Sequence, residues 1–336
     1  MSDPAASIRG VSFNYDDFQA LHNVNFDVDS ASFFGLLGPN GSGKTTLFRI
    51  LSTLMPPASG TCSVHGFDTT THPNDVRSVL GMIFQQPSLD EELTVRENLT
   101  FHGHMYGLRG KELQTRISSL ADRIGISDRL EDRVKKLSGG LKRRADIIRG
   151  ILHRPRLLLL DEPTTALDPA ARHSFWQLLS GLRQEEELTL ILATHLLEEA
   201  ESCDDVVILD RGKVAIQGNP TQLRENLGRQ MLWLTTASPE KLSELVQQKL
   251  SVETQVLNDA VCIADEKATS ALPALYESFG ELIDSATIRK PTLEDVFLTS
   301  TGNQYISVED ASHVDKAPQE PLANDGVSQQ SKPKAA

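Results

Sequence analysis

Cysteine is scarce in this sequence, which has only three among 336 residues: Cys62, Cys203 and Cys262. Their number is odd, and their spacing fits neither a disulfide framework nor a zinc site. We therefore expect inert, reduced thiols, as is typical of a protein in a reducing cytoplasm.

Long hydrophobic runs are also missing. The longest, Leu157 to Leu160 and Leu188 to Ala193, have the length of strands and fall far short of the roughly 20 residues that span a bilayer. Residues Met1 to Ala5 are polar and lack the apolar segment of a signal peptide. The sequence therefore predicts no direct membrane insertion.

Positive charge is in deficit, because 33 lysines and arginines face 46 aspartates and glutamates, for a net charge of −13. Both non-specific nucleic-acid binding and adsorption to anionic lipid depend on basic side chains that neutralise phosphates. We therefore expect no nucleic-acid partner. Any work at a membrane would require another subunit that holds this chain there.

A glycine-rich segment lies between an apolar strand-like run and a helical pattern, which is the order of a phosphate-binding P-loop. Its residues are Gly38, Pro39, Asn40, Gly41, Ser42, Gly43, Lys44, Thr45 and Thr46. Glycines let successive backbone N–H groups face phosphate oxygens, and the next helix directs its positive end there. Lys44 would reach the β- and γ-phosphates, and Thr45 would ligate Mg²⁺. A loop that merely capped a helix would not require Lys-Thr at this position.

Polar residues follow three further runs that read as buried strands. These residues are Gln85, then Asp161 and Glu162, and finally His195. Ligands of parallel sheets bind at the carboxyl ends of strands, so Asp161, Glu162 and His195 should lie at the edge to which the P-loop points. Gln85 lies at a break where the strand end could present its amide. A lone histidine at a strand end is usually an ordinary polar cap, but its expected position beside Lys44 and Glu162 favours a functional role.

The remaining pattern predicts the surrounding elements. Residues 7–34 alternate as an antiparallel strand pair, and residues 47–54 continue the P-loop into a helix that the following prolines end. Helical spacing dominates residues 93–149, beginning with a capping box at Thr94 and Glu97. These features predict a helical subdomain inserted into an α/β domain.

With its motifs in this order, the chain resembles the nucleotide-binding subunit of ATP-binding cassette (ABC) transporters from Ile8 to Leu223. The motifs that carry the resemblance, beyond the P-loop, are the Q-loop residue Gln85, the signature Leu137, Ser138, Gly139 and Gly140, the Walker B strand from Leu157 to Asp161 with Glu162 after it, the D-loop from Thr165 to Asp168, and the switch histidine His195. Tyr15 stands where the family has an adenine-stacking aromatic, although a half-buried strand aromatic is the plainer interpretation.

The resemblance implies a role for each residue. Lys44 and the P-loop amides would hold the phosphates of ATP, and Glu162 would act as the general base toward water. His195 would contact the γ-phosphate, and Asp161 would hold Mg²⁺ through water. Gln85 would sense both Mg²⁺ and the membrane partner.

The resemblance also implies partners. In the family, ATP lies between the P-loop of one subunit and the signature Ser138–Gly140 of another, and this chain has one of each. We therefore expect a second copy, or a homologous ATPase subunit, and an integral membrane permease. The expected location is peripheral, on the cytoplasmic face of the cell membrane.

The implied fold is a P-loop NTPase of the ABC type in residues 1–225, with a mostly parallel core sheet, antiparallel N-terminal strands and a helical subdomain at about 88–152. Residues 226–300 show a βαββαβ order, which predicts a ferredoxin-like α+β domain, and a capping box at Thr292 and Asp295 predicts a last helix. Residues 301–336 are polar and poor in aromatics, which predicts a disordered tail.

Two details of the sequence concern the branch of the family and the packing of the signature helix. Pro291 to Leu298 resembles the C-terminal hallmark of the family branch that exports drugs, polysaccharides and lipids. Ala145 and Gly150 replace larger residues of the signature helix, which predicts looser packing or an unusual neighbour.

We therefore expect an ATPase that powers an exporter. The alternatives are a soluble ABC ATPase acting on ribosomes or nucleic acid, and a nucleotide-sensing module without catalysis, which the intact Glu162 and His195 disfavour.

Overall fold

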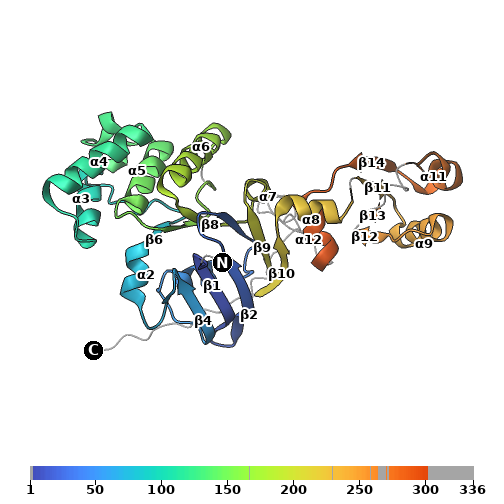
Figure 1. Cartoon of the computed structure of the whole chain (residues 1–336). Coiled ribbons are helices and arrows are strands. Elements are labelled where there is room, and N and C mark those ends of the chain that lie inside the picture. Colours follow the sequence, from blue (N-terminus) through green and yellow to red (C-terminus); the bar gives the residue numbers. More distant parts are fainter. Residues whose placement is uncertain are drawn as a thin grey trace, which may run out of the picture. The chain divides into compact units, whose positions relative to one another are not determined.

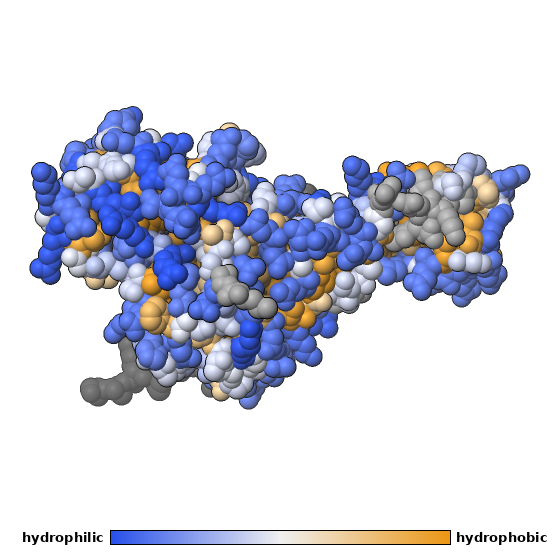
Figure 2. Space-filling view, viewed as in Figure 1, coloured by the Kyte–Doolittle hydropathy of each residue, from blue (hydrophilic) through white to orange (hydrophobic). Residues whose placement is uncertain are grey.

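A computed structural model describes residues 3–301 with the exception of Ala166, Arg229, Asn258, 264–269 and Ala271. Apart from Thr301, the predicted disordered tail lies outside the described residues. Among these residues, no helix combines the length and the apolar character needed to cross a bilayer. The face seen in Figure 2 is largely hydrophilic with smaller hydrophobic areas, as the charged fraction of 24% leads one to expect.

The central sheet follows from runs of leucine and isoleucine that are buried on both faces. Its strands lie in the order β10 (Lys213–Gly218), β9 (Asp205–Asp210), β3 (Phe33–Leu37), β8 (Thr189–Thr194), β7 (Leu157–Asp161) and β6 (Leu80–Ile83). All neighbours are parallel except β10 and β9, which are antiparallel. The mostly parallel core predicted from the sequence is confirmed, and it brings the ends of β3, β6, β7 and β8 to one edge.

A second, antiparallel sheet contains the predicted N-terminal strand pair. Its strands lie in the order β2 (Phe18–Val28), β1 (Ala6–Tyr15), β4 (Ser59–Val64) and β5 (Phe67–Asp68). Helix α1 (Lys44–Leu51) follows the P-loop and ends earlier than predicted. Thr53 adopts a left-handed backbone and Leu54 is 66% exposed, so the helix stops before the prolines.

The inserted helices form a layer of their own, in which α3, α4 and α5 contact one another (Figure 1). The other helices up to residue 226 are α2 (Pro73–Val79), α3 (Val95–Met105), α4 (Gly110–Ile124), α5 (Gly139–Ile151), α6 (Pro169–Glu186), α7 (Leu197–Ala200) and α8 (Pro220–Asn226). The capping box is confirmed: Thr94 Oγ1 accepts from Glu97 N, and Thr94 N donates to Glu97 Oε2.

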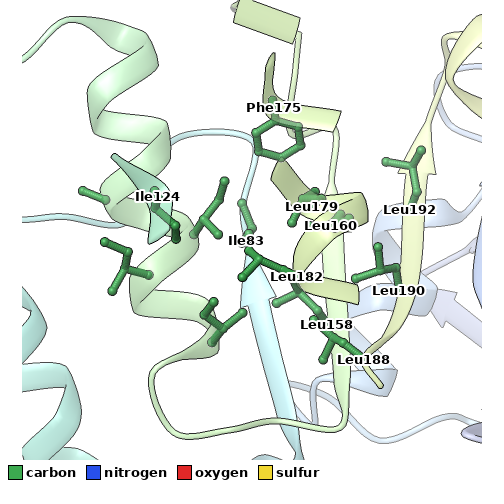
Figure 3. Packing of buried hydrophobic residues seen from close by; sticks show 14 of the residues in the cluster. Ile83, Ile124, Leu158, Leu160, Phe175, Leu179, Leu182, Leu188, Leu190 and Leu192 are labelled. Carbon is green, nitrogen blue, oxygen red and sulfur yellow. The ribbon is translucent and has the colours of Figure 1, made fainter. Parts of the chain in front are cut away.

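Two hydrophobic clusters cover the two faces of the central sheet. Leu158 and Leu160 of β7 point into one cluster with α4, α5 and α6, whereas Leu157 and Leu159 point into the other with α1. Figure 3 shows the first cluster, where Ile83, Leu158 and Phe175 come from β6, β7 and α6. Each fully buried leucine stabilises the fold by about 1.5–3 kcal/mol, so these clusters fix the sheet that carries the site.

Helix α5 approaches β6 closely where the sequence has a glycine on each side. A Cβ on Gly81 would lie 2.2 Å from the carbonyl oxygen of Gly150. The packing of α5 at Gly150 is therefore close and not loose, and the expectation of an unusual neighbour stays a prediction.

The C-terminal strands form a third, wholly antiparallel sheet in the order β12 (Gln255–Leu257), β13 (Ala260–Ile263), β11 (Met231–Thr235) and β14 (Ser285–Arg289). With α9 (Pro239–Leu250) and α11 (Leu272–Phe279) between strands, this is the predicted ferredoxin-like arrangement. Strand β14 begins later than predicted because residues 280–282 form a 3₁₀ turn.

The last helix, α12 (Leu293–Thr301), begins with the predicted capping box, since Thr292 Oγ1 accepts from Asp295 N at 3.3 Å. Its Leu293 and Phe297 belong to the core cluster formed by α4, α5 and α6, while the third sheet has a separate core with α9 and α11. The limits drawn at residues 225 and 300 stay predictions.

Candidate active site

The P-loop backbone cannot be built without glycine at two positions. Gly38 and Gly43 have φ values of 150° and 106°. A Cβ on Gly38 would lie 2.4 Å from the carbonyl oxygen of Leu209, and one on Gly43 would lie 2.7 Å from that of Ala20. Gly43 also caps α1 without a side-chain hydrogen bond, so the first-turn N–H groups can donate to an anion.

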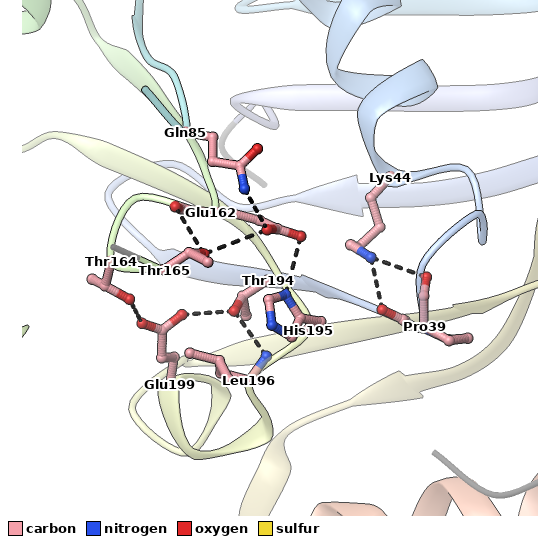
Figure 4. Close-up of polar contacts among 11 residues, drawn as sticks. Pro39, Lys44, Gln85, Glu162, Thr164, Thr165, Thr194, His195, Leu196 and Glu199 are labelled. Atoms are coloured by element: carbon pink, nitrogen blue, oxygen red, sulfur yellow. Dashed lines mark hydrogen bonds and ion pairs between the residues drawn. The ribbon is translucent and has the colours of Figure 1, made fainter. Parts of the chain in front are cut away.

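Lys44 is 6% exposed and turned back into the loop. Its ammonium donates to the carbonyl oxygens of Gly38 at 2.7 Å and Pro39 at 3.1 Å (Figure 4). Burial lowers the pKa of Lys44, and the charges of Glu162 and Asp161 oppose that shift. Ser42 Oγ is buried with no partner among the described residues. The loop thus presents a cation and an unpaired hydroxyl where phosphate oxygens would bind.

Two carboxylates end strand β7 beside the P-loop. Burial first, and then the charge of Glu162, raises the pKa of Asp161 to about 6, although the charges of Lys44 and Arg49 oppose the rise. Glu162 has a left-handed backbone with φ of 44°, and its N–H donates to the carbonyl oxygen of Ala193 at 2.9 Å. This bond fixes the turn after β7 against the end of β8.

The structure brings Glu162 together with Gln85 and His195, as predicted (Figure 4). His195 Nδ1 lies 3.1 Å from Glu162 Oε1, and Gln85 Nε2 donates to Glu162 Oε2 at 3.4 Å. Thr165 Oγ1 donates to the same Oε2 at 3.4 Å. The Glu162 side chain is 17% exposed, so its carboxylate is held by polar neighbours yet open to solvent.

A second polar group behind this site was not predicted. Glu199 of α7 is buried and accepts hydrogen bonds from the hydroxyls of Thr164 and Thr194. Nothing in the sequence marks it, because an acidic residue in a short polar helix reads as a solvent-exposed side chain.

A buried ionic cluster on α5 was not predicted either. Asp146 lies between Arg143 and Arg149, with Arg149 Nε donating to Asp146 Oδ1 at 2.8 Å. Arg143 also donates to the carbonyl oxygens of Phe84 and Gln85, at 2.6 and 2.5 Å. The spacing of these charges by three residues is visible in the sequence, but it equally suits an exposed helix face.

The signature residues do not lie in the Lys44 site of their own chain. Ser138 caps α5 by accepting from Leu141 N at 3.4 Å, and Ser138 and Gly140 line a separate cavity of about 350 Å³ between α5 and α6. A Cβ on Gly139 or Gly140 would meet no atom within 4 Å. The fold of this chain therefore does not require glycine at either position.

Two further predicted residues have mainly local contacts. Asp168 caps α6 by accepting from Ala171 N at 2.8 Å, and the D-loop residue Ala166 lies outside the described residues. Tyr15 packs edge-on against Phe13 and accepts from Arg49 Nη1 at 3.1 Å, with 37% of the residue exposed. Adenine stacking on Tyr15 stays a prediction.

The residues available to a metal ion suit Mg²⁺. In the described part of the chain, no cluster of three or more histidine, cysteine or acidic residues could hold a metal by itself. Thr45 is exposed at the start of α1, and Asp161 and Gln85 add carboxylate and amide oxygens. Mg²⁺ takes a few such oxygens and completes its shell with water and substrate phosphates.

A family model described as "ABC transporter" matches residues 21–165. The chain is 35% identical over 309 residues to the "Nod factor export ATP-binding protein I" of Rhizobium sp. (strain N33), an alignment that covers 90% of this chain and 99% of that protein. It is 34% identical over 310 residues to the "Daunorubicin resistance ATP-binding protein DrrA3" of Streptomyces coeruleorubidus, covering 90% and 98%.

Two solved structures that are similar to this chain also come from ABC proteins. One is cbiO1 from Clostridium perfringens, described as part of the ABC transporter complex cbiONQ, with a TM-score of 0.62, 26% identity and coverage of 74% of this chain and 97% of that one. Another is a dimeric ATP-binding cassette in a post-hydrolysis state bound to ADP and Pi, with a TM-score of 0.58, 26% identity and coverage of 64% and 98%.

Proposed function

This chain belongs to the ABC transporter family as an ATP-binding, ATP-hydrolysing subunit of the exporter type, and we propose that it works as a dimer on a separate membrane permease. The observation that carries the catalytic part of the proposal is the convergence of Gln85, Glu162 and His195 beside Lys44.

The chemistry follows from the positions of these side chains. Lys44 exchanges its loop carbonyls for phosphate oxygens, and the N-terminus of α1 adds N–H donors. Glu162 accepts a proton from the attacking water as the water oxygen bonds to the γ-phosphorus and the bond to ADP breaks. His195 and Gln85 fix the orientation of the Glu162 carboxylate. Mg²⁺, held by Thr45 and by Asp161 through water, would neutralise charge on the phosphates.

The open environment of the signature supports a dimer. Gly38 and Gly43 are required by atoms of their own chain, whereas Gly139 and Gly140 have open space around them. Glycine at the signature therefore serves something that approaches from outside, which we assign to the nucleotide bound by a second copy. Each pocket would then be completed by Ser138–Gly140 of the other subunit.

Our proposals that this chain powers export, and of the class of its cargo, are based on its relatives. One is named for the export of Nod factor and another for resistance to daunorubicin, so we propose outward transport of a comparable small molecule. Neither relative favours the alternative of action on ribosomes or nucleic acid. With this function, the chain would sit at the cytoplasmic face of the membrane through its permease.

A groove between α1, β6 and α3 offers the permease a docking surface. It encloses about 210 Å³ and is lined by apolar Leu54 and Phe84 with Arg149 at its side. His102 of α3 and the adjoining Tyr106 line the groove, and Phe101 and Met105, which precede them in sequence, are 60% and 81% exposed. Large apolar side chains left open beside a groove are typical of protein interfaces. We assign this surface to an amphipathic helix in a cytoplasmic loop of the permease.

The catalytic proposal is tested by Glu162→Gln, which keeps the shape of the side chain and removes the base. We expect ATP binding to persist, dimers to accumulate with ATP, and turnover to fall by about 10²–10⁴-fold. Size-exclusion chromatography and phosphate release measure the two effects. Turnover at the native rate would show that the base is another group.

The docking proposal is tested by Met105→Glu, with Tyr276→Glu as the matched control on α11, where Tyr276 is 42% exposed. Each variant is purified from gently solubilised membranes. We expect Met105→Glu to lose the copurifying polytopic subunit and the control to retain it, while both keep the ATPase rate of the isolated subunit. Equal recovery of the permease with both variants would place the docking surface elsewhere.

A further inference from the structure

Glu199 is an unusual residue, because its carboxylate is buried behind the site and is held by hydroxyl groups instead of a salt bridge. The residue is 6% exposed, and among the described residues no lysine, arginine or histidine pairs with its carboxylate. Burial of an unpaired carboxylate is costly unless hydrogen bonds replace the lost water. An apolar side chain would fill the same space without that cost, so the carboxylate oxygens themselves must be needed.

Each carboxylate oxygen of Glu199 accepts one hydroxyl. Thr164 Oγ1 donates to Oε1, and Thr194 Oγ1 donates to Oε2 at 2.6 Å (Figure 4). Both threonines are 1% exposed. Thr194 Oγ1 also accepts from Leu196 N at 3.0 Å, which leaves its proton for Glu199. Hydrogen bonds to a buried carboxylate are among the strong ones, so the three side chains form one rigid unit.

The two threonines stand beside the two groups that must meet during hydrolysis. Thr164 is two residues after Glu162, and Thr194 directly precedes His195. The 3.1 Å contact between Glu162 and His195 joins these two loops on the side of the nucleotide, and Glu199 joins them from behind. In the described part of the chain, the Glu199 carboxylate has no hydrogen bond to Glu162 or His195, so we expect its effect on them to pass through the threonines.

We propose that Glu199 is a positioning residue. It fixes the loop after β7 relative to the loop after β8, so that His195 and Glu162 are aligned when ATP is bound. This inference rests on the proposed role of Glu162. We call Thr164, Thr194 and Glu199 the clamp. Because none of the hydrogen bonds of these three side chains reaches the P-loop within the described residues, the clamp should govern turnover and leave ATP affinity unchanged. A misplacement of about 1 Å in a catalytic group can cost about 10²-fold in rate.

The test compares Thr164→Val and Thr194→Val with Thr189→Val in the full chain. Thr189 lies at the opposite end of the same strand, is fully buried, and accepts a hydrogen bond from Ala31 N at 2.9 Å. Valine keeps the shape of threonine and has a methyl group in place of the hydroxyl. We expect both clamp variants to lose about 10-fold or more in kcat with KM for ATP within about twofold, and the control to keep kcat within about twofold.

Variants of Glu199 complete the test. Glu199→Ala should lose as much kcat as the double variant Thr164→Val/Thr194→Val, because all three side chains act as one unit. Glu199→Gln should recover part of the loss, since an amide can accept one hydroxyl and donate to the other. Should a valine variant fail to fold, Thr164→Ser and Thr194→Ser restore the hydroxyl and are expected to have native kcat.

Three results would overturn the clamp: native kcat in both clamp variants, a rise in KM for ATP that matches the fall in kcat, or an equal loss of kcat in Thr189→Val. The outcome for Glu162→Gln is separate. Native turnover in that variant would remove the proposed base, and a defect in Thr194→Val alone would then show only that the end of β8 matters.

Discussion

Replacing Asp146 by asparagine removes the negative charge at the centre of the α5 cluster and leaves its size unchanged. Asp146 is fully buried, and Arg143 and Arg149 pair with it at 3.4 and 2.8 Å with side chains 4% and 11% exposed. Removing one partner of a buried ion pair strands the other charge away from water, which costs about 3–5 kcal/mol. We expect Asp146→Asn to lower the free energy of unfolding by that amount.

The matched control is Asp132→Asn, because Asp132 pairs with Arg129 at the same spacing of three residues and the same 3.4 Å. That pair is exposed, 49% for the arginine and 41% for the aspartate, so its loss should cost less than about 1 kcal/mol. The two substitutions thus differ chiefly in burial.

Urea unfolding measured by tryptophan fluorescence separates the two outcomes. The chain has two tryptophans, and Trp233→Phe leaves Trp176, whose ring lies 5.5 Å from that of Phe33 near the main core. Both aspartate variants are made in this background. Equal midpoints for Asp146→Asn and Asp132→Asn would refute the reasoning, because the buried cluster would then stabilise the fold no more than a surface pair.

Three other substitutions address single features of the fold. Gly140→Ala should stabilise the isolated chain by up to about 1 kcal/mol, since alanine favours the helix and its Cβ has open space. ATP turnover should nevertheless collapse, because in the proposed dimer the partner's nucleotide approaches Gly140. Thermal melts and phosphate release measure the two effects. Gly81→Ala should destabilise the chain by a few kcal/mol, because its Cβ would lie 2.2 Å from the carbonyl oxygen of Gly150, and a native Tm would contradict this. Burial lowers the pKa of His153 to about 4, below its ordinary 6.5, so the neutral ring contributes stability that is present above pH 6.5 and lost as the pH falls through 4. His153→Gln should therefore lose less Tm between pH 7 and pH 5 than the native chain, and parallel losses would show that this histidine is not responsible.

Local chemistry made much of the fold predictable. The leucines of β7 have only one favourable placement, between two layers, and the structure puts Leu158 and Leu159 into clusters on opposite faces. Capping boxes depend on residues three positions apart, so those at Thr94 and Thr292 could be located from spacing alone. The position of Glu162 and His195 at one sheet edge followed from one rule about parallel strand ends, whereas the role of Gln85 followed from the family resemblance.

Tertiary contacts decided the features of the fold that the sequence did not predict. The sequence pattern kept α1 helical to Leu54, but Leu54 is solvent-exposed and no packing supports another turn. Nothing in the sequence indicates that the polar residues Arg143, Asp146 and Glu199 are buried. Their burial depends on partners far along the chain, such as the carbonyl oxygen of Phe84, 59 residues from Arg143.

The α5 cluster also relates the two halves of the proposed dimer. Arg143 holds the carbonyl oxygens of Phe84 and Gln85, while Ser138 begins the same helix one turn earlier. The Gln85 side chain is linked to the site of its own subunit through its hydrogen bond to Glu162, whereas Ser138 would complete the pocket of the partner. In the proposed dimer, a displacement of the Q-loop at one nucleotide would move α5 through Arg143, and with it the signature at the other nucleotide. Two sites of ATP hydrolysis would then be coupled through one buried guanidinium.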